Sequence, residues 1–427
     1  VTTGVQNTVI GGLAGDALTT GSQNVALGYQ SLSTDDLGSH NVAIGANALS
    51  DMNFATATDS YNTAVGDQAG LRVTTGTNNT LIGGITGDAL TDADFNVAVG
   101  QGALSADTLG SRSTAIGRAA LSAQNFTTAT DTYNTAVGFH AGVAVTTAIR
   151  NTLIGGISGD ALTTGARNTT LGYATLSSDT LGSRTVAIGY EALGSQNFTT
   201  ATNAYNVAVG YSAGNVVTTG IQNTLVGALA GDALTDADYN TAVGVAALGS
   251  NVLGSRNTAL GSFALANQTF TTATDSYNTA VGFDAGVTIS TGTNNTIVGG
   301  LAGDAITTAI GSVAMGQGAL SALQTGNSNV AIGYGAGSGM NGVASNTCVG
   351  SSALDGVCGN SNVAIGVSCM GSTNSTSASN NTCMGDAAGF SLTSGANNLL
   401  LGKDAGRTGS PGGNLTTHSN NVVLGDE

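Results

Sequence analysis

The chain has 427 residues, with 66 Gly, one Pro, no Trp and a charged fraction of only 8%. Its formal net charge of −16 disfavours nucleic acid and anionic membrane surfaces as partners. The low aromatic and charged content argues against ordinary globular domains, while Val, Ile and Leu that recur at fixed intervals argue against disorder. No apolar run approaches the length needed to span a membrane.

A short sequence phrase, N-[TV]-[AL]-[VIL]-G, first begins at Asn7 and recurs as far as Asn421. Most successive phrases are separated by the same interval, which is the one from Asn7 to Asn24. Every fourth early step is longer, so the whole pattern returns once in four units, as from Asn62 to Asn134. We call this interval of four units the super-period. The fifth position of the phrase is always Gly, and the first is Asn except at Ser113, Thr185 and Ser312. Such regularity predicts a solenoid or a fibre.

Each phrase predicts one short strand that ends at its Gly, which allows the chain to turn. A strand this short is stable only when it is stacked on its copies. We expect the Asn side chains of adjacent rungs to stack, each amide bonding to the next. The fourth positions, such as Val65, Ile82 and Val99, should form a continuous apolar column.

The third and fifth positions share the other face of the strand. The third is mostly Ala, and the fifth is always Gly. A face this small indicates either a very thin coil or an interface between identical chains. A second segment, such as Asp16 to Thr19 or Ala48 to Ser50, is expected to return the chain on the opposite wall. The fold class predicted is all-β: a parallel β-solenoid or β-roll of about 24 rungs, spanning roughly 115 Å at the usual strand spacing.

One rung in each super-period is longer than the other three, and its extra residues predict a loop that bulges outward. Aromatic residues recur in these loops, in positions suited to stacking on the sugar rings of a ligand such as a glycan. The alternative is that each aromatic covers its own loop or a neighbouring chain. The candidate contact residues are Phe54, Tyr61, Phe126, Tyr133, Phe198, Tyr205, Phe270 and Tyr277.

The segment from Gly11 to Thr19 resembles a calcium-binding nonapeptide, with Asp16 and Leu18 in place. It lacks the fourth Gly and returns only once in each super-period, so we favour a plain Gly turn with a capping Asp. The acidic residues of other predicted turns are expected to be solvated; these are Asp35, Asp36, Asp59 and Asp131.

No residue pattern indicates an enzyme or a cofactor. The glycine-rich segment from Gly333 to Gly339 is the turn of the repeat itself and precedes no helix, which argues against a dinucleotide site. The three histidines, His40, His140 and His418, have no partner at ligand or triad spacing. We therefore predict no catalytic residue, no cofactor and no metal ligand.

The chain divides into a regular repeat shaft, residues 1–309, and an irregular repeat segment, residues 310–427. All four cysteines lie in the irregular segment, without a CxxC pair, and are interpreted as small buried apolar residues; they are Cys348, Cys358, Cys369 and Cys383.

The phrases "NTAVGFHAG" from Asn134 and "NVAIGANAL" from Asn41 resemble the repeats of fibre proteins that end in an endosialidase-type intramolecular chaperone. These include bacteriophage tail fibres and some bacterial surface proteins, and a similar phrase builds the β-roll heads of trimeric autotransporter adhesins. The resemblance covers Asn7 to Gly425 and implies a parallel homotrimer. It also implies that the chain, which starts at Val1 and carries no chaperone, is a processed piece of a longer protein.

The resemblance implies a phage tail fibre shaft that serves host recognition and is located extracellularly on the virion. Its expected partners are two further copies of itself, other tail proteins and a host surface receptor such as a glycan, with no membrane insertion. Because its rung lengths vary and it holds all four cysteines, the irregular segment, residues 310–427, is the expected receptor-contacting end. Two alternatives remain open: a trimeric adhesin anchored to the bacterial cell surface, and a purely structural extracellular filament. A virion-docking region or a membrane-anchor region elsewhere in the gene would distinguish the first two.

Overall fold

The structure is a computed structural model that describes residues 1–371, 377–407, 409 and 413–425. Among these residues the regular structure is β-strand without α-helix, which confirms the all-β prediction. The fold is a parallel β-solenoid of about 23 turns with a spacing of about 17 residues. It forms two compact units, Val1–Thr219 and Gly220–Glu427, which we describe separately.

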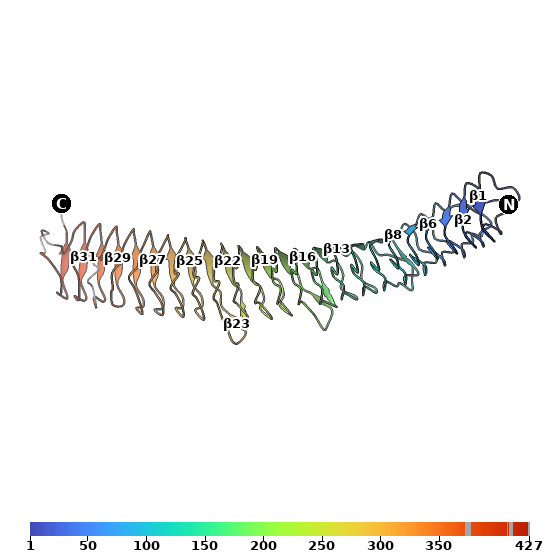
Figure 1. Ribbon diagram of the computed structural model, residues 1–427. Coiled ribbons are helices and arrows are strands. Elements are labelled where there is room, and N and C mark those ends of the chain that lie inside the picture. The colour runs from blue at the N-terminus through green and yellow to red at the C-terminus, as the bar shows by residue number, and fades with distance from the viewer. Residues whose placement is uncertain (372–376, 408, 410–412, 426–427) are drawn as a thin grey trace. The chain divides into compact units, whose positions relative to one another are not determined.

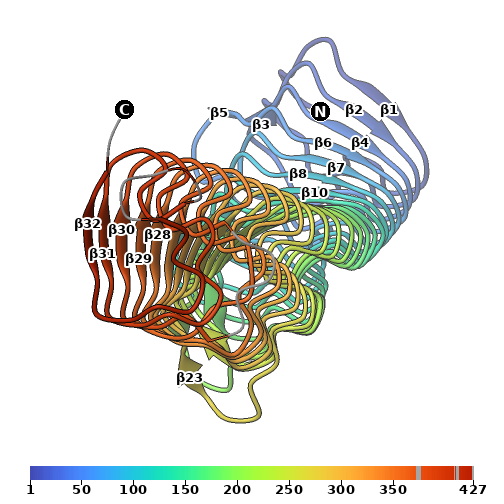
Figure 2. The same cartoon turned by 90° about the vertical axis from the view of Figure 1, so that its left-hand side faces the viewer.

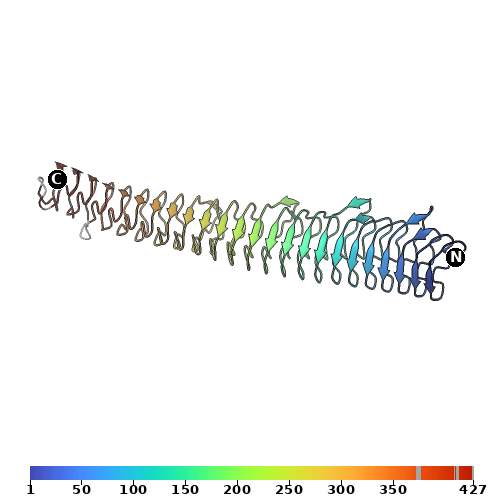
Figure 3. The same cartoon turned by 90° about the horizontal axis from the view of Figure 1, so that it is seen from above.

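In the first unit, each three-residue strand pairs in parallel with the next such strand along the chain (Figures 1 and 3). These strands are β1 (Thr8–Ile10), β2 (Val25–Leu27), β4 (Val42–Ile44), β6 (Thr63–Val65), β7 (Thr80–Ile82), β8 (Val97–Val99), β10 (Thr114–Ile116), β12 (Thr135–Val137), β13 (Thr152–Ile154), β14 (Thr169–Leu171), β16 (Val186–Ile188) and β18 (Val207–Val209).

The second unit repeats this arrangement. Its three-residue strands are β19 (Thr224–Val226), β20 (Thr241–Val243), β22 (Thr258–Leu260), β24 (Thr279–Val281), β25 (Thr296–Val298), β26 (Val313–Met315), β27 (Val330–Ile332), β28 (Thr347–Val349), β29 (Val363–Ile365), β30 (Thr382–Met384), β31 (Leu399–Leu401) and β32 (Val422–Leu424). The change of rung length predicted near residue 309 lies inside this unit, and strand pairing continues through it, for example between β25 and β26.

The strand register pairs each position of the phrase with the same position in the next rung. Ala64 pairs with Leu81, which pairs with Ala98, and all three side chains are fully buried. The small third position therefore faces the interior of the coil. Of the two alternatives predicted for this face, the thin coil is confirmed and the interface between identical chains is wrong. The fourth position does form the expected column, but on the outside, where Ile82 is 39% exposed.

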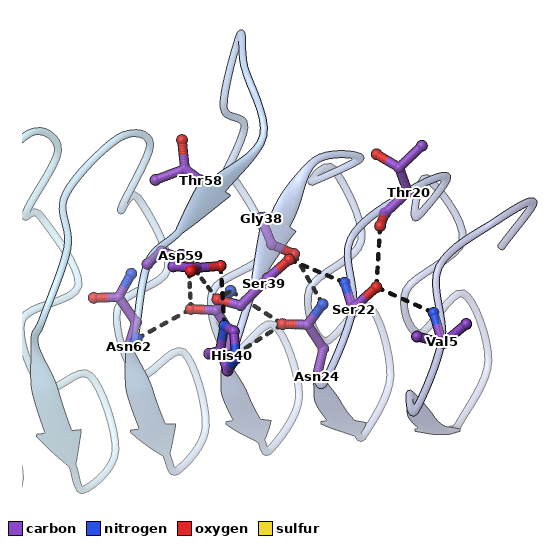
Figure 4. A network of polar contacts seen from close by, with 12 residues as sticks. Val5, Thr20, Ser22, Asn24, Gly38, Ser39, His40, Thr58, Asp59 and Asn62 are labelled. Atoms are coloured by element: carbon purple, nitrogen blue, oxygen red, sulfur yellow. Dashed lines mark hydrogen bonds and ion pairs between the residues drawn. The ribbon is translucent and has the colours of Figure 1, made fainter.

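A ladder of buried Asn side chains runs along each unit at the start of the strands. Figure 4 shows two of its members in the first unit, Asn24 and Asn62. The Oδ1 atom of Asn24 accepts from the backbone N–H of Asn41 at 2.8 Å, and the Nδ2 group of Asn24 donates to the Gly38 carbonyl at 2.9 Å. Direct bonds between side-chain amides occur in only some rungs, such as Asn41 to Asn24 at 3.1 Å. The predicted stacking is confirmed, but most of its bonds go to the backbone, since buried peptide groups need partners.

The invariant fifth Gly is explained by the approach of the next rung. At Gly100 the backbone has a φ of +128°, and a Cβ there would lie 2.6 Å from the carbonyl oxygen of Gly117. Both the backbone conformation and the space therefore require Gly.

Among the described residues the opposite wall forms no strand, yet backbone hydrogen bonds join its turns from one rung to the next. Thr74 N–H donates to the Thr91 carbonyl at 2.9 Å, and Leu49 N–H donates to the Ala69 carbonyl at 3.1 Å. Leu49 and Leu90 are fully buried beneath this wall. The predicted return segments are therefore present as stacked turns.

The longer rungs carry the extra loops, each ending in a two-residue parallel pairing with the preceding rung; Figure 2 shows the protruding loop at β23. The paired strands are β3 (Gly38–Ser39) with β5 (Thr58–Asp59), β9 (Gly110–Ser111) with β11 (Thr130–Asp131), β15 (Gly182–Ser183) with β17 (Thr202–Asn203), and β21 (Gly254–Ser255) with β23 (Thr274–Asp275).

Candidate functional site

The structure separates the two aromatics of each protruding loop. The phenylalanines are buried beneath the loops, while the tyrosines are about half exposed. Buried members are Phe54, Phe126, Phe198 and Phe270; exposed members are Tyr61, Tyr133, Tyr205 and Tyr277. Only the tyrosines are therefore available for contact with a ligand.

Each of these four loop tyrosines belongs to a longer row, which we call the leading column: the residues immediately before the first position of each phrase. In the first unit it comprises Gln6, Gln23, His40, Tyr61, Asn78, Phe95, Arg112, Tyr133, Arg150, Arg167, Arg184 and Tyr205. All of them have a positive φ, between 51° and 64°. This left-handed conformation turns the chain into the strand at every rung and is unusual for residues with side chains.

The leading column mixes aromatic rings with cations. The Arg112 guanidinium lies 4.8 Å from the centre of the Phe95 ring, and its Nε is 2.9 Å from Asp131 Oδ1. His40 occupies the same position one super-period earlier, where it pairs with Asp59 at 3.1 Å (Figure 4). The His40 ring also stacks on Tyr61. In the second unit, Arg256 repeats the arrangement with Asp275 at 2.9 Å, and this hydrogen bond raises the pKa of the guanidinium.

A second exposed row, the trailing column, follows the fifth Gly at the other end of the strands. Tyr173, Tyr190 and Tyr211 stack there, with ring centres 5.7 and 5.5 Å apart and nearly parallel planes. A hydrogen bond to Glu191 raises the pKa of the Tyr190 hydroxyl. Sequence reasoning missed these tyrosines; their common place directly after Gly172, Gly189 and Gly210 is the signal that identifies them.

The protruding loops are anchored by buried polar groups. Asp107 accepts hydrogen bonds from the backbone of Gly110 and Phe126 and from the Gln124 side chain at 2.6 Å. Burial nevertheless raises the pKa of Asp107. Asp35 occupies the same place in the first super-period and is fully buried, so the expectation that it is solvated was wrong. Asp59 and Asp131 are exposed, in short strands rather than turns.

The aspartates of the segments that resemble the calcium nonapeptide lie in turns, as predicted. Asp16 is exposed, whereas Asp88, Asp160 and Asp304 each bury an Oδ1 atom without a hydrogen-bond partner. Burial raises the pKa of all three of these carboxyls. No cluster of three metal-ligating side chains occurs in the part of the chain that the structure describes.

The four cysteines are free and buried, which confirms their interpretation as small apolar residues. Cys348 and Cys383 take the interior third position of their phrases, and Cys369 Sγ lies 3.2 Å from the Cys383 carbonyl. Burial raises the pKa of the Cys358 thiol to about 12, which disfavours the reactive thiolate.

Shallow surface hollows of the second unit include one beside Asp232 and Phe263 and one beside Gln317 and Tyr334. Each is lined mainly by small and neutral residues and contains one titratable side chain. Neither brings together a nucleophile and a base. The residues that the structure describes contain no helix capable of crossing a membrane.

No protein-family model matches the chain, and a search of curated proteins gave no match.

Proposed function

We propose that this chain is the shaft of a homotrimeric bacteriophage tail fibre that serves host recognition and adhesion. The observation that carries the proposal is the outer face of the strand sheet in each unit. Its fourth positions form an uninterrupted apolar column, with Ile82, Ile116 and Leu171 between 37% and 47% exposed. An extended apolar surface of this kind favours contact with another protein chain.

A second copy of the chain suits this face, because the same column repeats at every rung and identical parallel chains meet at equal heights. Thin rungs with a core made largely of Ala bury little surface alone, so assembly adds the missing apolar burial. The number of three chains and the place on a phage virion rest on the resemblance of the repeat phrase. The irregular segment, residues 310–427, is proposed as the receptor-contacting end; its residues 372–376, 408, 410–412, 426 and 427 lie outside the described part.

The test is the mass of the native assembly, measured by light scattering before and after denaturation. Three times the chain mass of 41.4 kDa is expected, falling to one chain mass on denaturation. Leu171→Glu should weaken the assembly by about tenfold or more, since it places a charge in the interface without a partner. Gln101→Glu, at an exposed position outside the column, is the matched control. A monomeric native chain would contradict the homotrimer.

A further inference from the structure

The third super-period of the first unit concentrates positive charge on an otherwise acidic molecule. Five of the eight arginines in the sequence lie in the leading column, and three occupy consecutive rungs: Arg150, Arg167 and Arg184. All three are exposed. Tyr133 and Tyr205, each about half exposed, occupy the rungs immediately before and after them. This part of the leading column therefore consists of three successive cations with an aromatic residue at either end.

Backbone bonds fix these arginines one above another. Strands β13, β14 and β16 pair in register, and the residues that precede them stack likewise. Arg167 N–H donates to the Ile149 carbonyl at 3.1 Å, and Arg184 N–H donates to the Ala166 carbonyl at 3.0 Å. With about 4.8 Å between rungs, the backbones of the outer two arginines are about 10 Å apart. Guanidinium groups carried on such closely stacked rungs repel one another, and an anion bound between them would offset that repulsion.

The carboxylates that neutralise this column elsewhere are replaced here. Arg112 and Arg256 each pair with an aspartate at 2.9 Å, Asp131 and Asp275, but the corresponding partner of Arg184 is the neutral Asn203, at 3.0 Å.

A second carboxylate is lost in the neighbouring position. The backbone N–H of Asp94 donates to the Ser111 hydroxyl, and that of Asp238 donates to the Ser255 hydroxyl. In the third super-period the same bond, to Ser183, is made by the uncharged Ala166. None of the ion pairs found among the described residues involves Arg150, Arg167 or Arg184.

We propose that Arg150, Arg167 and Arg184, bounded by Tyr133 and Tyr205, form a binding site for an anionic polysaccharide. Guanidinium groups bind carboxylate and sulfate oxygens with two parallel N–H donors, and tyrosine rings stack on the apolar faces of sugars. A linear polysaccharide that lies along the column would meet one cation per rung. The acidic remainder of the chain repels the same ligand, which confines it to this site.

The site rests on the proposed function in one respect: the polysaccharide that it binds would come from the host surface. It adds a contact on the side of the shaft to the one proposed for residues 310–427. The test uses the whole chain, with dextran sulfate and polygalacturonate as anionic probes and dextran as the neutral comparison, in a surface-binding assay. Native binding should favour both anionic probes and weaken as salt rises.

The decisive variant is the triple substitution Arg150→Gln, Arg167→Gln and Arg184→Gln. Gln is already found at this left-handed position at Gln6, Gln23 and Gln222, so the fold should tolerate it. Affinity for the anionic probes should fall by about tenfold or more. Asn203→Asp, which restores the carboxylate beside Arg184, should lower affinity by about threefold. The matched control removes three positive charges elsewhere, by Arg72→Gln, Arg118→Gln and Arg407→Gln, and should change affinity by less than about twofold.

Native binding to the anionic probes no stronger than to dextran would overturn the site, as would an equal loss in the control. A change in the mass of the assembly in the Arg150, Arg167 and Arg184 variant would also overturn it, because the column would then be a contact between chains. A trimer without anion binding refutes this site alone. A monomer with the expected pattern of binding refutes the homotrimer alone.

Discussion

The backbone N–H of Asn79 donates to the side-chain oxygen of Asn62 at 3.0 Å, one rung earlier in the solenoid. The Asn79 side chain in turn donates to the Ala93 carbonyl at 2.7 Å. Through its backbone and its side chain, the fully buried Asn79 thus connects three successive parts of the coil, and the same arrangement recurs along both units. The ladder ties the start of each strand to the rungs on both sides of it.

Asn79→Ala should therefore destabilise the first unit by about 2–4 kcal/mol, because it leaves buried backbone groups without partners. Asn79→Ser should cost less, since Ser312 occupies this position naturally and its hydroxyl accepts from Asn329 N–H at 3.3 Å. Urea unfolding followed by circular dichroism measures both. Gln101→Ala, at an exposed position, serves as the control, and an equal loss in the control would refute the role of the ladder.

A second prediction concerns the glycine column. Gly100→Ala should destabilise the first unit by about 2–4 kcal/mol, since it combines an unfavourable φ with overlap against Gly117. Gly84→Ala is the matched control: its φ is ordinary, and the nearest atom to an added Cβ is 3.9 Å away. Thermal unfolding of the two variants side by side is sufficient. Similar midpoints would show that the column does not need Gly.

These two columns show what the sequence could predict. An Asn and a Gly at fixed places in each phrase indicate a strand, its turn and its stacking, because identical residues in identical rungs must meet. Which face is interior was not predictable from Ala alone: Ala64 is compatible with the inside of a thin coil and with contact between chains. Only the path of the return wall, with Leu49 and Leu90 beneath it, decides between them.

The candidate site was predicted in part, for a related reason. Aromatic residues in the long rungs attracted attention as a set, yet Phe126 is buried and Tyr133 is exposed. The arginines fall in rungs of ordinary length, so no loop signalled them. Their alignment with Tyr133 and Tyr205 depends on the left-handed residue before each strand, a conformation that the side chains of Arg and Tyr do not reveal.

The separation of the loop aromatics is itself testable. Phe126→Ala should destabilise the first unit by about 3–5 kcal/mol, as expected for the loss of a buried ring. Tyr133→Asn should change stability by less than about 1 kcal/mol, because its ring is exposed and Asn accepts the left-handed conformation. Thermal unfolding distinguishes the two. Equal destabilisation would mean that Tyr133 is a structural residue rather than an available contact.

Acidification should stabilise the solenoid over a defined range. Burial raises the pKa of Asp88, Asp160, Asp304 and Asp355 above the unfolded value of about 3.8, so the folded state binds protons at a higher pH than the unfolded state does. Stability therefore falls as pH rises from about 3.8 through the raised values, and it increases when neutral solution is acidified toward pH 4. The unfolding midpoint in urea, measured between pH 4 and 7, should be highest near the acidic end.

Asp88→Asn isolates one of these groups. It replaces a carboxylate, one of whose oxygens is buried without a hydrogen-bond partner, by a neutral amide, so it should raise stability at pH 7 and reduce the gain on acidification. Asp67→Asn removes the same charge from an exposed position and separates this effect from the relief of general repulsion in a chain with a net charge of −16. If both variants flatten the pH dependence equally, net charge rather than burial is its cause.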